Sequence, residues 1–307
     1  MKLIFAGTPA FALPSLRALA EQFHIAAVLT QPDKPQGRKG VLTPPPVKAE
    51  ALARGIPVLQ PEKLKADFSA LAGAGADLMV TCAYGQILTQ EILDLFPLGV
   101  WNVHASLLPA YRGAAPIARA ILGGEKETGV TIMKTDVGLD TGDMFLQERL
   151  PISDTDTCGT LTEKLASLGA KLICEAVSRI QRGDVILKKQ GEGQVCRKVS
   201  RTPIDFTRPA REVSALIRGL SPAPLAYGVC GGLLINCYNA QVQPISEPAP
   251  AGMVVACSPM KGLVVACGEG AVRITELQPA GGKRMADTAF ANGGKLTEGA
   301  RFDQPVL

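Results

Sequence analysis

Residues 2–30 read KLIFAGTPAFALPSLRALAEQFHIAAVLT, a stretch that combines two kinds of apolar pattern. Strands buried on both faces are predicted by two short, almost continuously apolar runs, KLIFAG at 2–7 and HIAAVLT at 24–30. Between them, AFALPSLRALAEQF at 10–23 places its apolar residues at helical spacing. A strand, a helix and a second strand in this order predict a parallel β-α-β unit.

The same alternation continues to about residue 187. Further strands are predicted at ADLMVTCAY (76–84), GVWNVHA (99–105) and TGVTIMKT (128–135), and further helices at GAAPIARAILGG (113–124) and TLTEKLASLGAKLICEAVSRIQRG (160–183). We therefore predict that residues 1–187 form a doubly wound α/β domain with a mainly parallel, Rossmann-like sheet. In such sheets, ligands bind beyond the carboxyl ends of the strands.

The composition changes after Asp184. Between Lys188 and Arg218 the chain carries eight Lys and Arg residues against three acids, so we interpret 188–204 as a basic linker. Beyond it come short apolar runs separated by Gly and Pro: GLLINCYNAQV, GMVVACS, GLVVACGEG and AVRITELQ. This pattern predicts a small β-barrel of the oligonucleotide-binding (OB) type at 205–307.

The overall composition is that of an ordinary folded protein. Of 307 residues, 47% are hydrophobic and 20% charged, with a formal net charge of +4. The N-terminal apolar run is interrupted at Thr8 and Pro9, before it reaches the roughly 7–15 residues of a signal peptide. The charge-free run at 219–246 contains prolines, which excludes a membrane helix there. We expect a cytoplasmic monomer that has no contact with membranes.

The spacing of potential ligand residues argues against two classes of site, a metal site and a dinucleotide site. The eight cysteines occur without a Cys-x-x-Cys pair, and the two histidines, His24 and His104, lie far apart. We therefore expect reduced, buried thiols and no metal. The first turn, AGTPAFA, has one glycine where a dinucleotide-binding fold would have Gly-x-Gly-x-x-Gly, so a nicotinamide enzyme is disfavoured.

The first cluster of candidate catalytic residues is NVHASLLPAYRG, residues 102–113, at the end of a predicted strand. A neutral imidazole at His104 could accept a proton, and the amide of Asn102 could donate to an oxygen that becomes negative. A carboxylate that orients the histidine would complete a site for acyl transfer. The candidates in TDVGLDTGDMF are Asp136, Asp140 and Asp143, and the residues alone do not rank Asp140 above Asp136. The alternative for His104 is a structural role at the strand end.

Two segments carry a family resemblance, NVHASLLPAYRGAAPIARAI at 102–121 and ETGVTIMKTDVGLDTGDM at 127–144. They resemble the folate-dependent formyltransferases, and most closely the branch of that family that acts on methionyl-tRNA. Further matches extend the resemblance over nearly the whole chain: IFAGTPAFA, TQPDKPQGRKGVLTPPPVKAEA, AYGQIL and LQPAGGKRM. After Leu-Leu-Pro, where members of the family often carry a basic residue and then an aromatic one, this chain has Ala110 and Tyr111.

The resemblance implies a reaction and a set of site residues. The donor would be 10-formyltetrahydrofolate, the acceptor would be the α-amine of methionine esterified to initiator tRNA, and no metal is implied. The resemblance assigns Asn102, His104 and Asp140 as the catalytic residues, which selects Asp140 over Asp136. The folate-contacting positions that it implies are Ser106, Leu107, Leu108, Pro109, Tyr84, Gly85 and Ile87.

Basic residues indicate where RNA would bind. The segment QPDKPQGRKGVLTPPPVK at 31–48 follows the second predicted strand, and its prolines and glycines predict an irregular loop. We expect Arg38 and Lys39 in this loop to contact the tRNA acceptor end, and Arg197 and Lys198 in the linker to contact phosphates further along. The alternative is a solvated, charged loop.

Three other functions are compatible with parts of the pattern. The same chemistry could serve another acceptor, an amino-sugar nucleotide or glycinamide ribonucleotide, although the long C-terminal region argues against the latter. A non-catalytic RNA-binding protein could retain the scaffold and the site residues. A dehydrogenase is the third alternative, which the single glycine of the first turn disfavours.

Overall fold

The computed structural model describes the whole chain except residues 38–39, 246 and 306–307. Two compact units are present, and each is discontinuous in sequence. Unit 1 comprises residues 1–113, 128–150 and 162–196, whereas unit 2 comprises 114–127, 151–161 and 197–307. The segment predicted as a linker is thus divided between the units at Cys196.

The core of unit 1 is a seven-stranded sheet with the order β10-β9-β7-β6-β1-β2-β5. Its strands are β1 (Lys2–Gly7), β2 (His24–Leu29), β5 (Val58–Leu59), β6 (Leu78–Cys82), β7 (Val100–His104), β9 (Glu127–Lys134) and β10 (Met144–Pro151). The five strands from β7 to β5 are parallel. This confirms the mainly parallel sheet, but β9 pairs antiparallel with β7.

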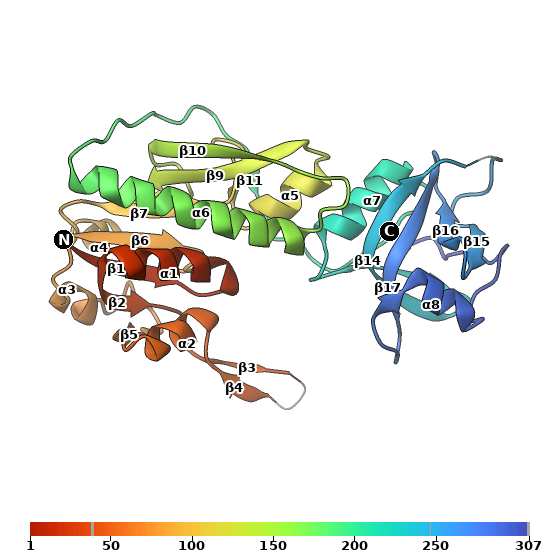
Figure 1. Cartoon of the computed structure of the whole chain (residues 1–307), viewed down its shortest axis with the longest axis horizontal. Helices are drawn as coiled ribbons and strands as arrows, with labels where there is room; N and C mark the ends of the chain where they lie inside the picture. Colours follow the sequence, from red (N-terminus) through yellow and green to blue (C-terminus); the bar gives the residue numbers. More distant parts are fainter. Residues whose placement is uncertain (38–39, 246, 306–307) are drawn as a thin grey trace. The chain divides into compact units, whose positions relative to one another are not determined.

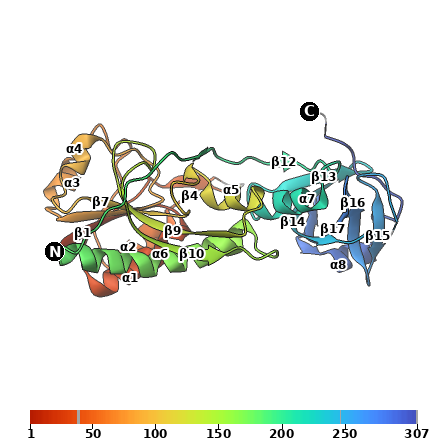
Figure 2. The same ribbon diagram turned by 90° about the horizontal axis from the view of Figure 1, so that it is seen from above.

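Helices cover both faces of this sheet, as expected for a doubly wound fold. Figure 2 shows α1 (Leu13–Gln22) and α6 (Cys158–Gln181) on one side, and α3 (Ser69–Gly73) and α4 (Gln90–Leu93) on the other. Because side chains alternate along a strand, Ile4 and Ala6 of β1 point to the α3 and α4 side, where they join one buried cluster.

The segment at 31–48 is more regular than the sequence predicts. Two short strands, β3 (Lys34–Gln36) and β4 (Val41–Thr43), form an antiparallel hairpin (Figure 1). The helix α2 (Pro46–Ala53) follows it. Prolines are tolerated here because Pro35 lies in an isolated two-stranded ribbon, and Pro46 occupies the first turn of a helix, where a missing N–H costs little.

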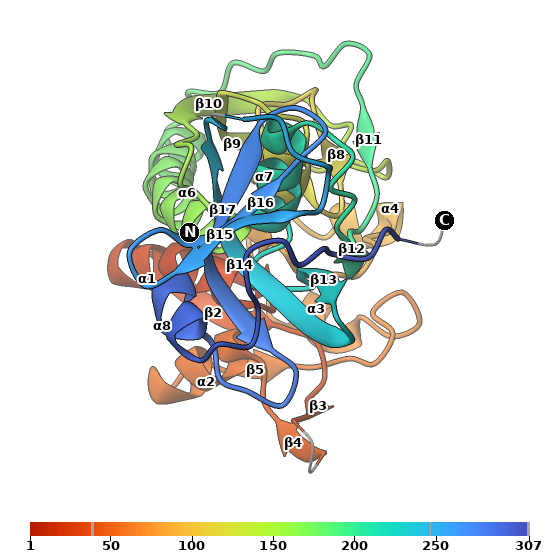
Figure 3. The ribbon, with the colours of Figure 1, turned by 90° about the vertical axis from the view of Figure 1, so that its right-hand side faces the viewer.

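Unit 2 contains a mostly antiparallel sheet with the order β12-β13-β14-β17-β16-β15, and β18 pairs with β17 (Figure 3). Its strands are β12 (Thr202–Pro203), β13 (Ala226–Cys230), β14 (Leu233–Gln243), β15 (Val254–Ser258), β16 (Gly262–Ala266), β17 (Ala271–Pro279) and β18 (Met285–Ala286). This confirms the predicted β-rich C-terminal domain.

The C-terminal segment 300–303 connects the two sides of this sheet. On one side, Val254 N donates to Ala300 O and Phe302 N donates to Gly252 O. On the other side, Asp303 N donates to Val229 O in β13. The sheet therefore curls toward a barrel.

The helix α5 (Pro116–Leu122) was predicted within the first domain, but it belongs to unit 2. It packs against α7 (Ala210–Gly219), and a Cβ on Gly219 would lie 3.0 Å from Leu122 Cγ and 3.2 Å from Ala118 O. A glycine at the end of α7 allows this close approach. Sequence periodicity identifies the helix, but it cannot reveal which partner the helix packs against.

Candidate active site

The site lies in unit 1, at the carboxyl end of β7. Asn102 and His104 are two residues apart on this strand, so their side chains leave the same face of the sheet. His104 is buried, with 5% of its surface exposed, and it lies opposite Thr131 of β9. The strand therefore places both predicted groups at the edge where parallel sheets bind ligands.

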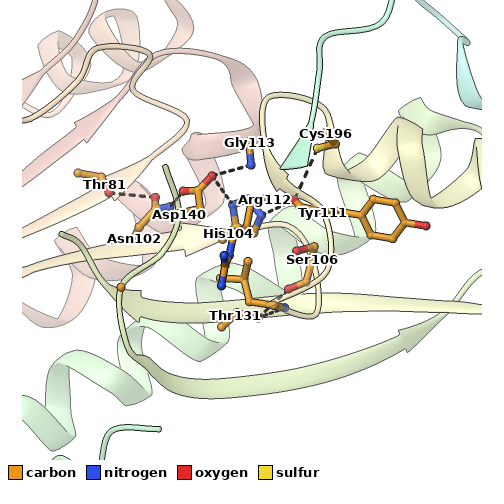
Figure 4. Close-up of polar contacts among 12 residues, drawn as sticks. Thr81, Asn102, His104, Ser106, Tyr111, Arg112, Gly113, Thr131, Asp140 and Cys196 are labelled. Carbon is orange, nitrogen blue, oxygen red and sulfur yellow. Dashed lines mark hydrogen bonds and ion pairs between the residues drawn. The ribbon is translucent and has the colours of Figure 1, made fainter. Parts of the chain in front are cut away.

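The ring of His104 lies between two hydrogen-bond acceptors (Figure 4). Its Nε2 is 3.0 Å from the carbonyl oxygen of Tyr111, and its Nδ1 is 3.6 Å from Oδ2 of Asp140. A neutral imidazole has one N–H and can donate to only one of these acceptors. The Tyr111 carbonyl lies at hydrogen-bond distance from Nε2, whereas the Asp140 carboxylate lies beside Nδ1 at the distance of an ion pair.

Asp140 connects His104 to Asn102. Its Oδ2 accepts the backbone N–H of Gly113 at 2.8 Å, and its Oδ1 accepts Nδ2 of Asn102 at 3.3 Å. Asp136, the alternative left open by the sequence, serves its own loop: it accepts the N–H of Gly138 at 3.1 Å and the hydroxyl of Thr141 at 2.9 Å. Of the two carboxylates, Asp140 is the one that the loop directs to His104.

The amide of Asn102 is fixed at both ends. Its Oδ1 accepts the hydroxyl of Thr81 at 2.9 Å, and one hydrogen of its Nδ2 is directed to Asp140. An amide nitrogen carries two hydrogens, so the second can donate to a reacting oxygen. Thr81, at the end of the neighbouring strand β6, thus orients the donor.

Both acceptors of His104 occupy strained backbone positions. Tyr111 has φ +58° and Asp140 has φ +52°, in the left-handed region that residues other than glycine rarely adopt. Such conformations cost on the order of 1–3 kcal/mol and concentrate at functional sites. The surrounding contacts therefore impose the two turns that aim the Tyr111 carbonyl and the Asp140 carboxylate at the ring.

The Ser-Leu-Leu-Pro turn is held from inside the protein. Ser106 is fully buried, and its hydroxyl donates to the carbonyl of Ala110 at 2.6 Å. The hydroxyl of Thr131 donates to the carbonyl of Ser106 at 2.7 Å and accepts the N–H of Leu108 at 3.1 Å. In this structure Ser106 therefore shapes the turn, and its hydroxyl is already engaged.

The other residues predicted to contact folate divide by exposure. The ring of Tyr84 is buried in the core, and burial raises the pKa of its phenol to about 12. Leu108 is also buried. In contrast, the side chain of Ile87 is 80% exposed, and Leu107 and Pro109 are half-buried. These three apolar side chains are accessible to a ligand.

A cavity of about 300 Å³ borders the turn. Its lining includes Leu108, Pro109, Gln147, Lys188 and Lys189. Apolar walls with amide and amine groups at the edge are suited to an organic anion. Among the described residues, no group of three His, Cys, Asp or Glu side chains is arranged to hold a metal ion.

The structure describes two of the four residues that are predicted to bind tRNA. Arg38 and Lys39 fall outside the described residues. Arg197 and Lys198 belong to unit 2 and are exposed, and their carbonyls accept hydrogen bonds from the guanidinium of Arg119 at 3.2 and 3.3 Å. Their side chains are therefore presented to solvent by a backbone that is held in place. No helix in the described part of the chain is long and apolar enough to cross a membrane.

Three supporting groups escaped the sequence analysis: the hydroxyl of Thr81, the N–H of Gly113 and the carbonyl of Tyr111. Two of these are backbone groups, which no residue pattern identifies directly. The one signal in the sequence is the glycine at position 113, which the structure explains by a φ of +103° and by Cys196 O, 2.7 Å from where a Cβ would lie. The Arg-Gly pair after Tyr111 is part of the motif, but its structural reason is the pairing of Arg112 with Val195 and of Gly113 with Cys196, far along the chain.

Comparison with known proteins agrees with the geometry. A formyl transferase family model matches residues 1–177, and a model of the formyl transferase C-terminal domain matches 198–295. A methionyl-tRNA formyltransferase from Janthinobacterium sp. (strain Marseille) is 46% identical over 316 residues, which covers 98% of this chain and 100% of that protein.

Solved structures share the fold at low sequence identity. A HypX variant from Aquifex aeolicus superimposes with a TM-score of 0.67 at 17% identity; the match covers 97% of this chain but 48% of HypX, so this chain spans about half of that protein's length. An N-formyltransferase from Helicobacter canadensis, in complex with folinic acid and dTDP-3-aminofucose, gives a TM-score of 0.62 at 20% identity and covers 89% of this chain and 98% of that one. From the two family models and the full-length relative, we conclude that the chain belongs to the formyl transferase family.

Proposed function

We propose that this protein transfers the formyl group of 10-formyltetrahydrofolate to the α-amine of methionyl initiator tRNA. The observation that carries the proposal is the connected set of Asn102, His104 and Asp140 at the carboxyl end of β7. The acceptor is inferred from the relative that matches over its full length and is named a methionyl-tRNA formyltransferase. The protein acts in the formylation step that precedes translation initiation.

The accessible residues around the site suit a folate. Ile87, Leu107 and Pro109 offer apolar surface to flat rings, and exposed lysines line the cavity beside the turn. A related fold has been solved with folinic acid bound. When bound, 10-formyltetrahydrofolate supplies an electrophilic formyl carbon and a nitrogen that leaves with the folate.

Side chains of the protein then stabilise the negative charge on the formyl oxygen and accept the proton of the amine. An α-amine titrates near pH ~8, so a substantial fraction is already the neutral nucleophile and a modest base suffices. The free hydrogen of Asn102 Nδ2 donates to the formyl oxygen as it becomes negative. His104 accepts the proton released by the amine, and the Asp140 carboxylate beside its ring orients it for this role. The same proton is then available for the departing nitrogen.

The direct test is a formylation assay with two acceptors. The protein is incubated with 10-formyltetrahydrofolate and either methionyl-tRNA or a dTDP-amino sugar, and formylated products are identified by mass spectrometry. We expect formylmethionine on the tRNA, formed roughly 10²-fold or more slowly by the His104→Ala variant. Formylation of the amino sugar without formylation of methionyl-tRNA would show that the acceptor is wrong.

The basic residues should hold the tRNA through its phosphates. Each lost phosphate contact weakens binding and flattens the dependence of log affinity on log salt by about one unit or slightly less. We therefore expect Arg38→Ala with Lys39→Ala, and separately Arg197→Ala with Lys198→Ala, to weaken tRNA binding and reduce this slope. Folate binding should remain intact in both variants. If tRNA affinity and the salt dependence are unchanged for one pair, that pair does not contact the tRNA and is only a solvated, charged surface.

A further inference from the structure

Residues 190–196, within the part of the predicted basic linker that belongs to unit 1, lie against the site. The strand β11 (Val195–Cys196) pairs in parallel with β8 (Arg112–Gly113), which directly follows Tyr111. The N–H of Arg112 donates to Gln194 O at 2.9 Å, and its guanidinium donates to Gly191 O at 2.8 Å. The loop that carries one acceptor of His104 is therefore attached to residues 190–196.

Gln190 in this segment contacts both loops that face His104. Its Oε1 accepts Nε of Arg112 at 3.0 Å. Its Nε2 donates to the carbonyl of Asp140 at 3.0 Å and to the carbonyl of Gly142 at 2.6 Å. The amide oxygen of Gln190 thus binds the loop that contains Tyr111, and both amide hydrogens bind the loop that contains Asp140.

The Asp140 loop needs such support. Asp140 has φ +52°, in the left-handed region that residues other than glycine adopt infrequently, so contacts that hold the loop help to maintain it. The loop is also tightly packed: a Cβ on Gly142 would collide with the carbonyl of Lys134. The two hydrogen bonds from Gln190 hold the carbonyls at and just beyond the strained residue, and so fix the direction in which its carboxylate leaves the backbone.

We propose that Gln190 is a positioning residue for the formyl transfer reaction, which joins the two loops that supply both acceptors of His104. This inference rests on the proposed function for its role in catalysis, although the placement of the His104 ring can be tested without any substrate. Gln190 acts through Asp140 and the Tyr111 loop, and it does not touch the reacting atoms.

Gln190→Glu is the sharpest variant because it changes the chemistry and keeps the shape. The glutamate can still accept from Arg112, but its second oxygen would face two carbonyl oxygens that now receive no hydrogen bond. Gln190→Met, which removes the amide with little change in volume, serves if the glutamate variant does not fold. Gln194→Ala is the matched control, since that side chain is exposed and makes no hydrogen bond to the described residues.

The first measurement is histidine-selective ¹⁵N NMR of the protein without substrate. The chain has two histidines, so the ring signals of exposed His24 provide an internal reference for those of His104. We expect Gln190→Glu and Gln190→Met to move the His104 ring signals and leave those of His24 in place. The Gln194→Ala control should leave both sets unchanged. Unchanged His104 signals in a folded Gln190 variant would overturn the proposal.

The second measurement is steady-state formylation of methionyl-tRNA. Loss of two hydrogen bonds to the Asp140 loop should lower kcat roughly tenfold, while KM for each substrate changes less than about twofold. A lowered melting temperature with unchanged kcat and unchanged His104 signals would show that Gln190 is only a structural tie, and would also overturn the proposal. If the unmodified protein does not formylate methionyl-tRNA, the proposed function is wrong, and the NMR result still decides the role of Gln190.

Discussion

Replacing Asp140 by asparagine tests the central contact of the site with the smallest change in shape. The carboxylate accepts from Gly113 N at 2.8 Å and from Asn102 Nδ2 at 3.3 Å, and it lies 3.6 Å from His104 Nδ1. An asparagine offers one oxygen and one NH₂ group in their place. If the asparagine oxygen faces Gly113 and His104, the asparagine NH₂ group faces the NH₂ group of Asn102, and two donors oppose each other. If the asparagine is flipped, its NH₂ group faces the N–H of Gly113, and again two donors oppose each other.

The cost follows from these contacts. A hydrogen bond to a charged group contributes about 1.5–3 kcal/mol, and leaving a buried donor without a partner costs roughly 1–3 kcal/mol. The side chain of Asp140 is 19% exposed, so water compensates only part of this loss. A net loss of about 3 kcal/mol in the transition state lowers the rate roughly 10²-fold, because each 1.36 kcal/mol is a factor of ten.

The assay is single-turnover formylation of methionyl-tRNA with saturating 10-formyltetrahydrofolate, compared between Asp140→Asn and the unmodified protein. Asp136→Asn is the matched control on the same loop, because its Oδ1 can still accept from Gly138 and Thr141. We expect the formylation rate of the control to stay within about threefold of that of the unmodified protein, because Asp136→Asn loses no net hydrogen bond. An Asp140→Asn rate near normal, or an equal loss in both variants, would refute the assigned role of Asp140.

Two further outcomes are expected. His104→Ala and Asn102→Ala should each reduce turnover by roughly 10²-fold or more with folding intact, as measured by the same assay and by circular dichroism; near-normal turnover would remove the residue from the mechanism. Hydrogen bonds from Arg17 and then Arg54 lower the pKa of Glu50 from 4.5 to about 2. The ionised form therefore stabilises the fold above pH 4.5, and this contribution is lost as the pH falls toward 2. The melting temperature of Glu50→Gln should consequently lie below that of the unmodified protein at pH 6 and approach it at pH 3, whereas a gap that widens on acidification would contradict this.

Local sequence determined the elements that depend on short-range pattern. The apolar runs at 2–7 and 24–30 and the helical spacing between them are sufficient to specify a parallel β-α-β unit, since burial of both strand faces requires continuous apolar residues. The two-residue spacing of Asn102 and His104 likewise places both on one face of a strand. In an α/β sheet of this class, ligands bind beyond the carboxyl ends of the strands, so residues at the end of this strand are candidates for the site.

Tertiary structure decided what depends on contacts between distant segments. The family resemblance selects Asp140 over Asp136, but the physical reason for that choice lies in the fold: the Asp140 carboxylate accepts from Gly113 N, whereas the Asp136 carboxylate accepts from Gly138 N in its own loop. The packing of α5 in unit 2 and the reach of Gln190 to Arg112 and Asp140 depend on chain segments 48 residues or more apart. Hydrogen bonds to backbone carbonyls leave no trace in residue type, because every residue has a carbonyl and only the folded chain selects which one is used.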